Sequence, residues 1–235
     1  MPLAANNFLT LNAQAAELIR EGNLQSAIPV LRAALNDLAG SIHDTESQPL
    51  EKVSASALTS EVARNLLPIR SVPSCQHDFT CQDHQLFFMF DRALYMEATD
   101  PNVISAVFGK STMAVIILYN LGLVYQLQGI RKPSKQKVVF EKAMRLYRLA
   151  VAILEKSPTD EIEMQGLVYM SVLNNMAHIY SHFYEERAVQ WCLDWLEFIL
   201  EVCPARQGDL GVDYMIFRVN VVTLRGQKTA AAAAE

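Results

Sequence analysis

The sequence predicts a mostly α-helical domain built from antiparallel helical hairpins. Apolar residues recur at the three-and-four spacing of amphipathic helices along most of the chain. Short breaks that contain glycine or proline divide these runs into couples. A composition of 51% hydrophobic and 19% charged residues suits a packed core, not a disordered chain. We therefore expect residues 1–235 to form one domain.

The first helical pair is expected within residues 1–43. Residues 7–21 carry one apolar face, and residues 24–42 resume the same period. Gly22 supplies the turn between them, because glycine tolerates the left-handed conformation common at helix ends. Pro29 lies inside the second run, where it is expected to weaken or kink the first turns.

Residues 44–100 are expected to be an insertion, rich in Ser, Thr, Pro, Asp and Gln. The aromatic segment 86–96 fits a strand paired with Leu66–Val72 in a small β-hairpin, or one more helix. Periodicity does not decide between these over so few residues. The run Leu86–Tyr95 either covers the helical core or forms a second binding surface.

The helical period returns strongly after residue 100. We expect a second pair in 101–160, a third in 161–204, a terminal helix in 205–227 and a frayed tail in 228–235. Within the two pairs, the predicted helices span 102–129, 136–156, 163–183 and 186–202. Valines near residue 220 make a strand the alternative for the terminal segment.

Three sets of residues repeat a common pattern of apolar and small side chains. The second pair has Leu118, Leu121, Gly122, Tyr125 and Gly129, then Ala143, Tyr147 and Ala150. The third has Leu173, Met176, Ala177 and Tyr180, then Ala188, Cys192 and Trp195, the last where a small residue is usual. The first has Leu11, Ala15, Leu18 and Gly22, then Ala27, Leu31 and Ala34. This pattern resembles the tetratricopeptide repeat, and the resemblance implies a short right-handed solenoid with insertions.

Small residues in this pattern let paired helices approach closely. Glycine inside a helix costs about 1 kcal/mol relative to alanine, so Gly122 indicates a packing need. Gly122→Leu is therefore expected to destabilise the domain by overpacking. Ala15 and Ala177 are expected to serve the other two pairs in the same way.

The resemblance implies a protein-interaction adaptor or scaffold that binds a partner protein or peptide, without catalysis or cofactors. Its binding groove would be lined by the first helix of each pair. The expected partner-binding residues are Tyr119, Leu123, Gln126, Asn174, His178, Ser181 and His182. The alternative is that several of them contact the insertion or the terminal helix. His178 and His182 also share a helical face, which suits a metal ion.

Two further clusters carry alternatives. The basic cluster is Arg131, Lys132, Lys135, Lys137, Lys142, Arg145 and Arg148, with the single acid Glu141. It fits docking of an acidic partner, or a solvated face balanced by Asp160, Glu161, Glu163, Glu185 and Glu186. The donors Cys75, His77, Cys81 and His84 lie within ten residues and would suit zinc. They define the competing hypothesis, a metal-stabilised regulatory or enzymatic protein.

Composition disfavours several other classes. A net charge of −5 argues against nucleic-acid binding, which depends on neutralising phosphates. The most apolar stretch, Met113–Tyr125, is 13 residues long, shorter than the roughly 20 of a membrane span. The N-terminal residues MPLAANNFLT lack the basic start and apolar run of a signal peptide, so we expect none. Four scattered cysteines suit reduced thiols. We expect a cytoplasmic or nuclear protein that is not an enzyme, with self-association as a third alternative.

Overall fold

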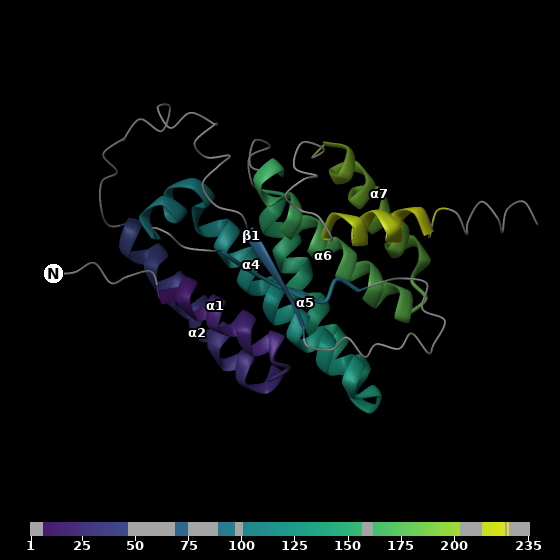
Figure 1. Cartoon of the computed structure of the whole chain (residues 1–235), viewed down its shortest axis with the longest axis horizontal. Helices are drawn as coiled ribbons and strands as arrows, with labels where there is room; N and C mark the ends of the chain where they lie inside the picture. Colours follow the sequence, from purple (N-terminus) through teal and green to yellow (C-terminus); the bar gives the residue numbers. More distant parts are fainter. Residues whose placement is uncertain are drawn as a thin grey trace, which may run out of the picture.

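The computed structural model describes residues 7–46, 69–74, 89–96, 101–156, 162–202, 213–223 and 225. The protein is mostly helical, with one small two-stranded sheet in this part of the chain. The mostly helical fold class is confirmed. Figure 1 shows the described helical pairs following one another in chain order, from α1 and α2 through α4 and α5 to α6 and α7.

The first pair consists of α1 (Asn7–Arg20) and α2 (Leu24–Glu46). Gly22 joins them with a φ of 76°. Two backbone bonds close the end of α1, from the Asn23 N–H to the Leu18 carbonyl and from the Gly22 N–H to the Ile19 carbonyl. This is the glycine cap that the sequence predicted.

The position of Pro29 inside α2 did not delay the start of that helix. Helix α2 begins at Leu24 and contains Pro29 in its second turn. A proline there removes one N–H···O bond to the carbonyl four residues earlier, which belongs to Gln25. Both residues are exposed, so water can satisfy the carbonyl and the helix continues.

The second pair consists of α4 (Pro101–Arg131) and α5 (Gln136–Leu154), joined by the short 3-10 turn η2 (Pro133–Lys135). Helix α4 is broken at Gly109, whose φ of 61° and ψ of 160° are not helical. Glycine adopts this positive φ without the steric penalty of a side chain.

The predicted close approach of the second pair is present. A methyl group built on Gly122 would lie 2.5 Å from Cε1 of Tyr147 on α5. Tyr147 is fully buried, so its ring has no free space into which to move. Ala15 and Ala177 are also fully buried on helices.

The third pair consists of α6 (Ile162–His182) and α7 (Glu186–Val202), followed by a helix over residues 213–223. Trp195, which stands where the repeat pattern has a small residue, stacks on Tyr169 of α6 with ring centroids 6.2 Å apart. The terminal segment is a helix and not the alternative strand. Its Tyr214 hydroxyl donates to the Leu200 carbonyl of α7.

Within the aromatic segment 86–96, the strand alternative is confirmed for Arg92–Met96, whereas residues 89–91 are neither strand nor helix. β1 (Ile69–Pro73) and β2 (Arg92–Met96) are antiparallel, with Ile69 opposite Met96 and Pro73 opposite Arg92. β2 contacts α1 and α4, the first helices of two pairs. The strand β2 therefore lies against the first helices of the first and second pairs, and Figure 1 shows the sheet crossing the helices near α4 and α5.

One described helix segment, Gly109–Arg131, is long and apolar enough to cross a membrane by length and composition. Of its most apolar window, 83% is buried inside the protein. It packs against α5, α2 and α6, as the core helix of a folded domain does.

Candidate functional site

The inner groove is the surface formed by the first helices of the three pairs, α1, α4 and α6, and it includes the predicted partner-binding residues. Five of these seven are buried: Tyr119, Leu123, Gln126, Asn174 and His178. Ser181 and His182 are half-buried. These side chains do not line an open surface. Tyr119 contacts the backbone of the protein's own segment 89–96, Asn174 accepts a hydrogen bond from Asn220 of the terminal helix, and Gln126 bonds to His178 inside the protein.

Two asparagines hold that segment by its backbone. Asn120 of α4 accepts a hydrogen bond from the Leu94 N–H at 2.8 Å and donates to the Leu94 carbonyl at 2.6 Å. Asn175 of α6 contacts Phe90 in the same way, with both distances 2.9 Å. Each carboxamide therefore satisfies both backbone groups of one residue. We call Asn120 and Asn175 the asparagine clamps.

Two further side chains complete the contacts with the backbone. Asn12 of α1 donates to the Leu94 carbonyl at 3.1 Å, and its own Oδ1 accepts from Asn120. The Tyr119 hydroxyl lies 2.9 Å from the Arg92 carbonyl and 3.2 Å from the Phe90 carbonyl. Helices α1, α4 and α6 thus all contribute to holding alternate residues of one extended segment.

The asparagine clamps occupy equivalent positions in the second and third pairs. Asn120 precedes Gly122 by two residues, and Asn175 precedes Ala177 by two. Both positions fall on the same face of their helices, because the two pairs repeat the same packing pattern. Sequence reasoning missed Asn12, Asn120 and Asn175, although this shared offset was available to reveal the clamps.

Side chains of the segment pack inward as well. Phe90, Ala93 and Leu94 are fully buried. The Phe90 ring lies 4.8 Å from the ring of Phe217 on the terminal helix, centroid to centroid. The segment is therefore enclosed between the inner groove and residues 213–223.

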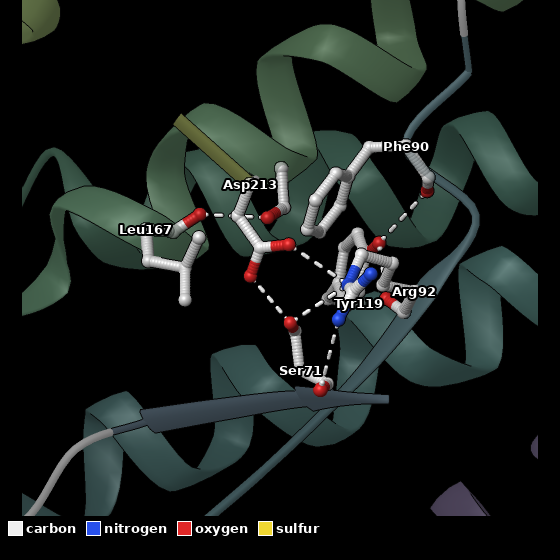
Figure 2. A network of polar contacts seen from close by, with 7 residues as sticks. Ser71, Phe90, Arg92, Tyr119, Leu167 and Asp213 are labelled. Carbon is white, nitrogen blue, oxygen red and sulfur yellow. Dashed lines mark hydrogen bonds and ion pairs between the residues drawn. The ribbon is translucent and has the colours of Figure 1, made fainter. Parts of the chain in front are cut away.

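An ion pair links the segment to the terminal helix (Figure 2). Arg92 Nε lies 2.8 Å from Asp213 Oδ1 and donates to Ser71 Oγ on β1. The Ser71 hydroxyl donates to the other carboxylate oxygen of Asp213. Burial raises the pKa of Asp213 above its ordinary value, while Ser71 and Arg92 oppose that shift. These three residues join β1, β2 and the start of the terminal helix.

A second buried network lies beneath the clamps. The Tyr147 hydroxyl donates to Gln126 Oε1 at 2.8 Å, and Gln126 Nε2 lies 3.0 Å from His178 Nδ1. Burial lowers the pKa of His178 to about 3, with a smaller contribution from His182. A neutral His178 accepts the Gln126 N–H, so all three polar groups are satisfied inside the protein.

The two predicted sets of metal ligands are not brought together as a metal site in the described part of the chain. Cys75, His77, Cys81 and His84 lie outside the described residues. Within the described ranges, no three His, Cys, Asp or Glu side chains gather into a metal-binding group. His178 and His182 contact one another with ring centroids 4.8 Å apart.

The seven cations of the basic cluster are exposed on α4, η2 and α5. In the part of the chain that the structure describes, none of them forms an ion pair with a carboxylate. Lys142 lies over the Tyr125 ring, 5.7 Å from its centroid, and Arg148 lies over the Tyr180 ring at 6.0 Å. Glu185 and Glu186 form no ion pair with these cations in this part of the chain.

The outer groove is a second hollow, open to solvent, between α5 and α7. It has a volume of about 340 Å³. Its floor is Met176 and Tyr180 of α6, and its walls include Val151 of α5 and Trp191 of α7. Met176 and Tyr180 lie on a different face of α6 from the clamp residue Asn175.

The fold and these contacts define a class: a helical protein of paired helices that encloses an extended segment of its own chain. Comparisons with protein-family models, curated proteins and solved structures found no match for this chain.

Proposed function

We propose that the protein is a protein-interaction scaffold of the tetratricopeptide-like kind, and that its inner groove binds an extended segment by the backbone. The observation that carries this proposal is the pair of asparagine clamps. Asn120 and Asn175 satisfy the N–H and carbonyl of Leu94 and Phe90. In the structure the occupant is the protein's own segment 89–96, and a partner segment would take its place.

Backbone recognition suits a scaffold because it does not depend on the sequence of the bound segment. Every non-proline residue offers one N–H and one carbonyl. Side chains then add selectivity, as Phe90 and Leu94 do here from positions four residues apart. A partner segment with large apolar residues at this spacing and no proline at either position would match the groove.

The chemistry of the groove also supports binding over catalysis. Its polar groups are carboxamides, tyrosine hydroxyls and His178, whose pKa burial lowers to about 3. Tyr147 has its pKa raised far above the ordinary value by burial. These groups stay neutral near pH 7, so they supply hydrogen bonds and not proton transfer.

A peptide added in trans tests the proposal. Residues 89–96 are replaced in the chain by Gly and Ser, and a labelled peptide of residues 89–96 is titrated while its fluorescence anisotropy is followed. We expect the released variant to bind the peptide and the wild-type chain not to bind it. Thermal melting with and without peptide provides the second readout, because a bound peptide raises the melting temperature even of a weakened fold.

Two controls isolate the clamps. Adding Asn120→Leu to the released variant should weaken peptide binding about tenfold or more, since each hydrogen bond contributes roughly 1 kcal/mol. N-methylation of the peptide at Leu94 removes the N–H and should weaken binding similarly. A peptide that fails to bind or stabilise the released variant, or that binds equally well after both changes, would contradict the proposal.

A further inference from the structure

We infer that the inner groove selects a segment that carries an arginine two residues after its aromatic anchor, and that Asp213 is the residue that makes this selection. The inference rests on the proposed function, because it describes which partner segments the groove accepts in place of residues 89–96. Three observations carry it: a buried carboxylate paired with one arginine, a hydroxyl and a carbonyl that accept from the guanidinium, and a helix that contacts two side chains of the segment at once.

Asp213 is a buried acid that takes its counter-charge from the segment. Its side chain is 10% exposed, and Arg92 Nε lies 2.8 Å from Oδ1. Among the described residues, Arg92 is the cation paired with this carboxylate, and Oδ1 accepts no hydrogen bond. Removing one partner of a buried ion pair leaves an uncompensated charge, which is strongly unfavourable. A segment with a neutral or acidic residue at this position is therefore disfavoured by Asp213.

The guanidinium of Arg92 contributes more than its charge. Its Nε donates to Ser71 Oγ at 2.8 Å, and its Nη2 donates to the Ser71 carbonyl at 3.4 Å. The Ser71 hydroxyl in turn donates to Asp213, so the three side chains form one connected network (Figure 2). A guanidinium presents its donors in a fixed plane, whereas the ammonium of lysine is a point charge on a flexible stem. The site therefore favours arginine over lysine as well as over neutral residues.

The terminal helix contacts two side chains of the segment in register. Phe217 packs against Phe90 with ring centroids 4.8 Å apart, and Asp213 pairs with Arg92. Asp213 and Phe217 are four positions apart in a helix and so lie on one face. Four helical residues rise about 6 Å and two residues of extended chain rise about 7 Å, so both contacts form together. An aromatic residue and an arginine are thus recognised at a fixed spacing.

The selected class is a segment of the form aromatic-x-Arg-x-Leu. Phe90 and Leu94 are fully buried, and Arg92 lies midway between these two apolar anchors. The asparagine clamps hold the backbone of both anchors. A bound segment therefore cannot slide along the groove to bring a more distant arginine to Asp213.

Three peptides test the selection on the released variant, in which residues 89–96 are replaced by Gly and Ser. The peptides are the wild-type sequence of residues 89–96 and two versions with citrulline or lysine in place of Arg92. Citrulline keeps the shape of arginine without its charge. Fluorescence anisotropy should show binding of the citrulline peptide weakened about tenfold or more, with the lysine peptide intermediate.

Two protein variants show whether Asp213 makes the selection. Asp213→Asn in the released variant should reduce the preference for arginine over citrulline to about twofold or less, because no buried charge is then left unpaired. Asp194→Asn removes the same charge from an exposed position on α7 and should leave the preference unchanged. A purely structural role for Asp213 would weaken both peptides equally and preserve their ratio, which would overturn the inference.

The outcomes separate this inference from the proposed function. If the wild-type and citrulline peptides bind equally well, the groove binds segments without selecting arginine, and only the inference is overturned. If a folded released variant binds none of the peptides, the proposed function is contradicted and the inference fails with it.

Hydrogen exchange of the Leu94 amide gives a second measurement in the intact chain. Arg92→Gln should speed this exchange about tenfold or more, because it leaves the Asp213 carboxylate unpaired. Adding Asp213→Asn should bring the rate back to within about threefold of wild type, since the two residues are coupled. Additive effects of the two changes would overturn the inference.

Discussion

The inner and outer grooves differ in how their surfaces are satisfied. In the inner groove, carboxamides meet the backbone of segment 89–96, and apolar side chains such as Phe90 fill the remaining space. In the outer groove, Trp191 is partly exposed to solvent and lines an open hollow together with Arg148 and Glu155. A groove between helical pairs can therefore be filled by a segment of the same chain, while the hollow between α5 and α7 stays open to solvent.

The largest expected effect comes from breaking a clamp. Asn175→Leu leaves the buried Phe90 N–H without its acceptor, which costs about 1–3 kcal/mol. It also removes one of the two donors to the Phe90 carbonyl, which keeps the Tyr119 hydroxyl. We expect a loss of about 2–4 kcal/mol of unfolding free energy in all, measured by urea denaturation. Asn175→Asp retains an acceptor for the N–H but buries a carboxyl group that faces the Phe90 carbonyl, so it should also destabilise the fold. Equal stability of Asn175→Leu and wild type would mean that the inner groove is not closed by this contact.

The next largest effect is expected at the contact between α4 and α5, where Gly122 lies against Tyr147. Gly122→Leu forces a side chain against the buried Tyr147 ring, which a single Cβ would already approach to 2.5 Å. Overpacking of this kind costs about 1–3 kcal/mol, and calorimetry should show the lower melting temperature. Gly40→Leu is the matched control, because a Cβ at Gly40 has no atom within 4 Å. Equal melting temperatures for the two variants would mean that Gly122 and Tyr147 are not packed as closely as the structure shows.

A pH series tests whether the inner groove is dry. The folded pKa of His178 is about 3 and its ordinary value is 6.5, so below pH 6.5 the unfolded chain binds a proton that the folded chain does not. Stability contributed by neutral His178 is present above pH 6.5 and is lost as pH falls toward 3. We expect about 1 kcal/mol of loss between pH 7.5 and 5.5 from this residue. Urea denaturation of His178→Gln should show a shallower pH dependence, and an unchanged slope would indicate a hydrated groove.

The smallest expected effect lies in the outer groove. Trp191 is 38% exposed, so Trp191→Ala loses little burial and should cost less than about 1 kcal/mol, well below the 3–5 kcal/mol of a core aromatic. Urea denaturation of Trp191→Ala beside Phe90→Ala gives the comparison directly. A cost for Trp191→Ala near that of Phe90→Ala would show that the outer groove is core and not an open surface.

The helices could be predicted from sequence because their signals are local. The three-and-four spacing, Gly22 and the breaks near residues 132 and 184 each act within one or two turns. Residues 136–156 were expected to be helical, and α5 spans Gln136–Leu154. Pro29 was harder to interpret, since its cost depends on whether the released carbonyl reaches water.

The filling of the inner groove could not be predicted in this way. The contacts of Asn120 with Leu94 and of Asn175 with Phe90 join residues 26 and 85 positions apart in the sequence. The spacing of apolar residues within a helix carries no information about such distant contacts. The partner-binding residues predicted from the repeat pattern all lie on α4 and α6. The pattern did not indicate that segment 89–96 would lie against these helices and contact Tyr119.

The short connection after β2 sets a threshold for any competing ligand. β2 ends at Met96 and α4 begins at Pro101, so a displaced segment stays tethered within a few residues of the site. Tethering by a short linker corresponds to a local concentration on the order of millimolar. A soluble competitor must therefore overcome this advantage through tighter contacts or through simultaneous attachment elsewhere on the molecule. A peptide that binds weakly and at this site alone would therefore not displace the segment.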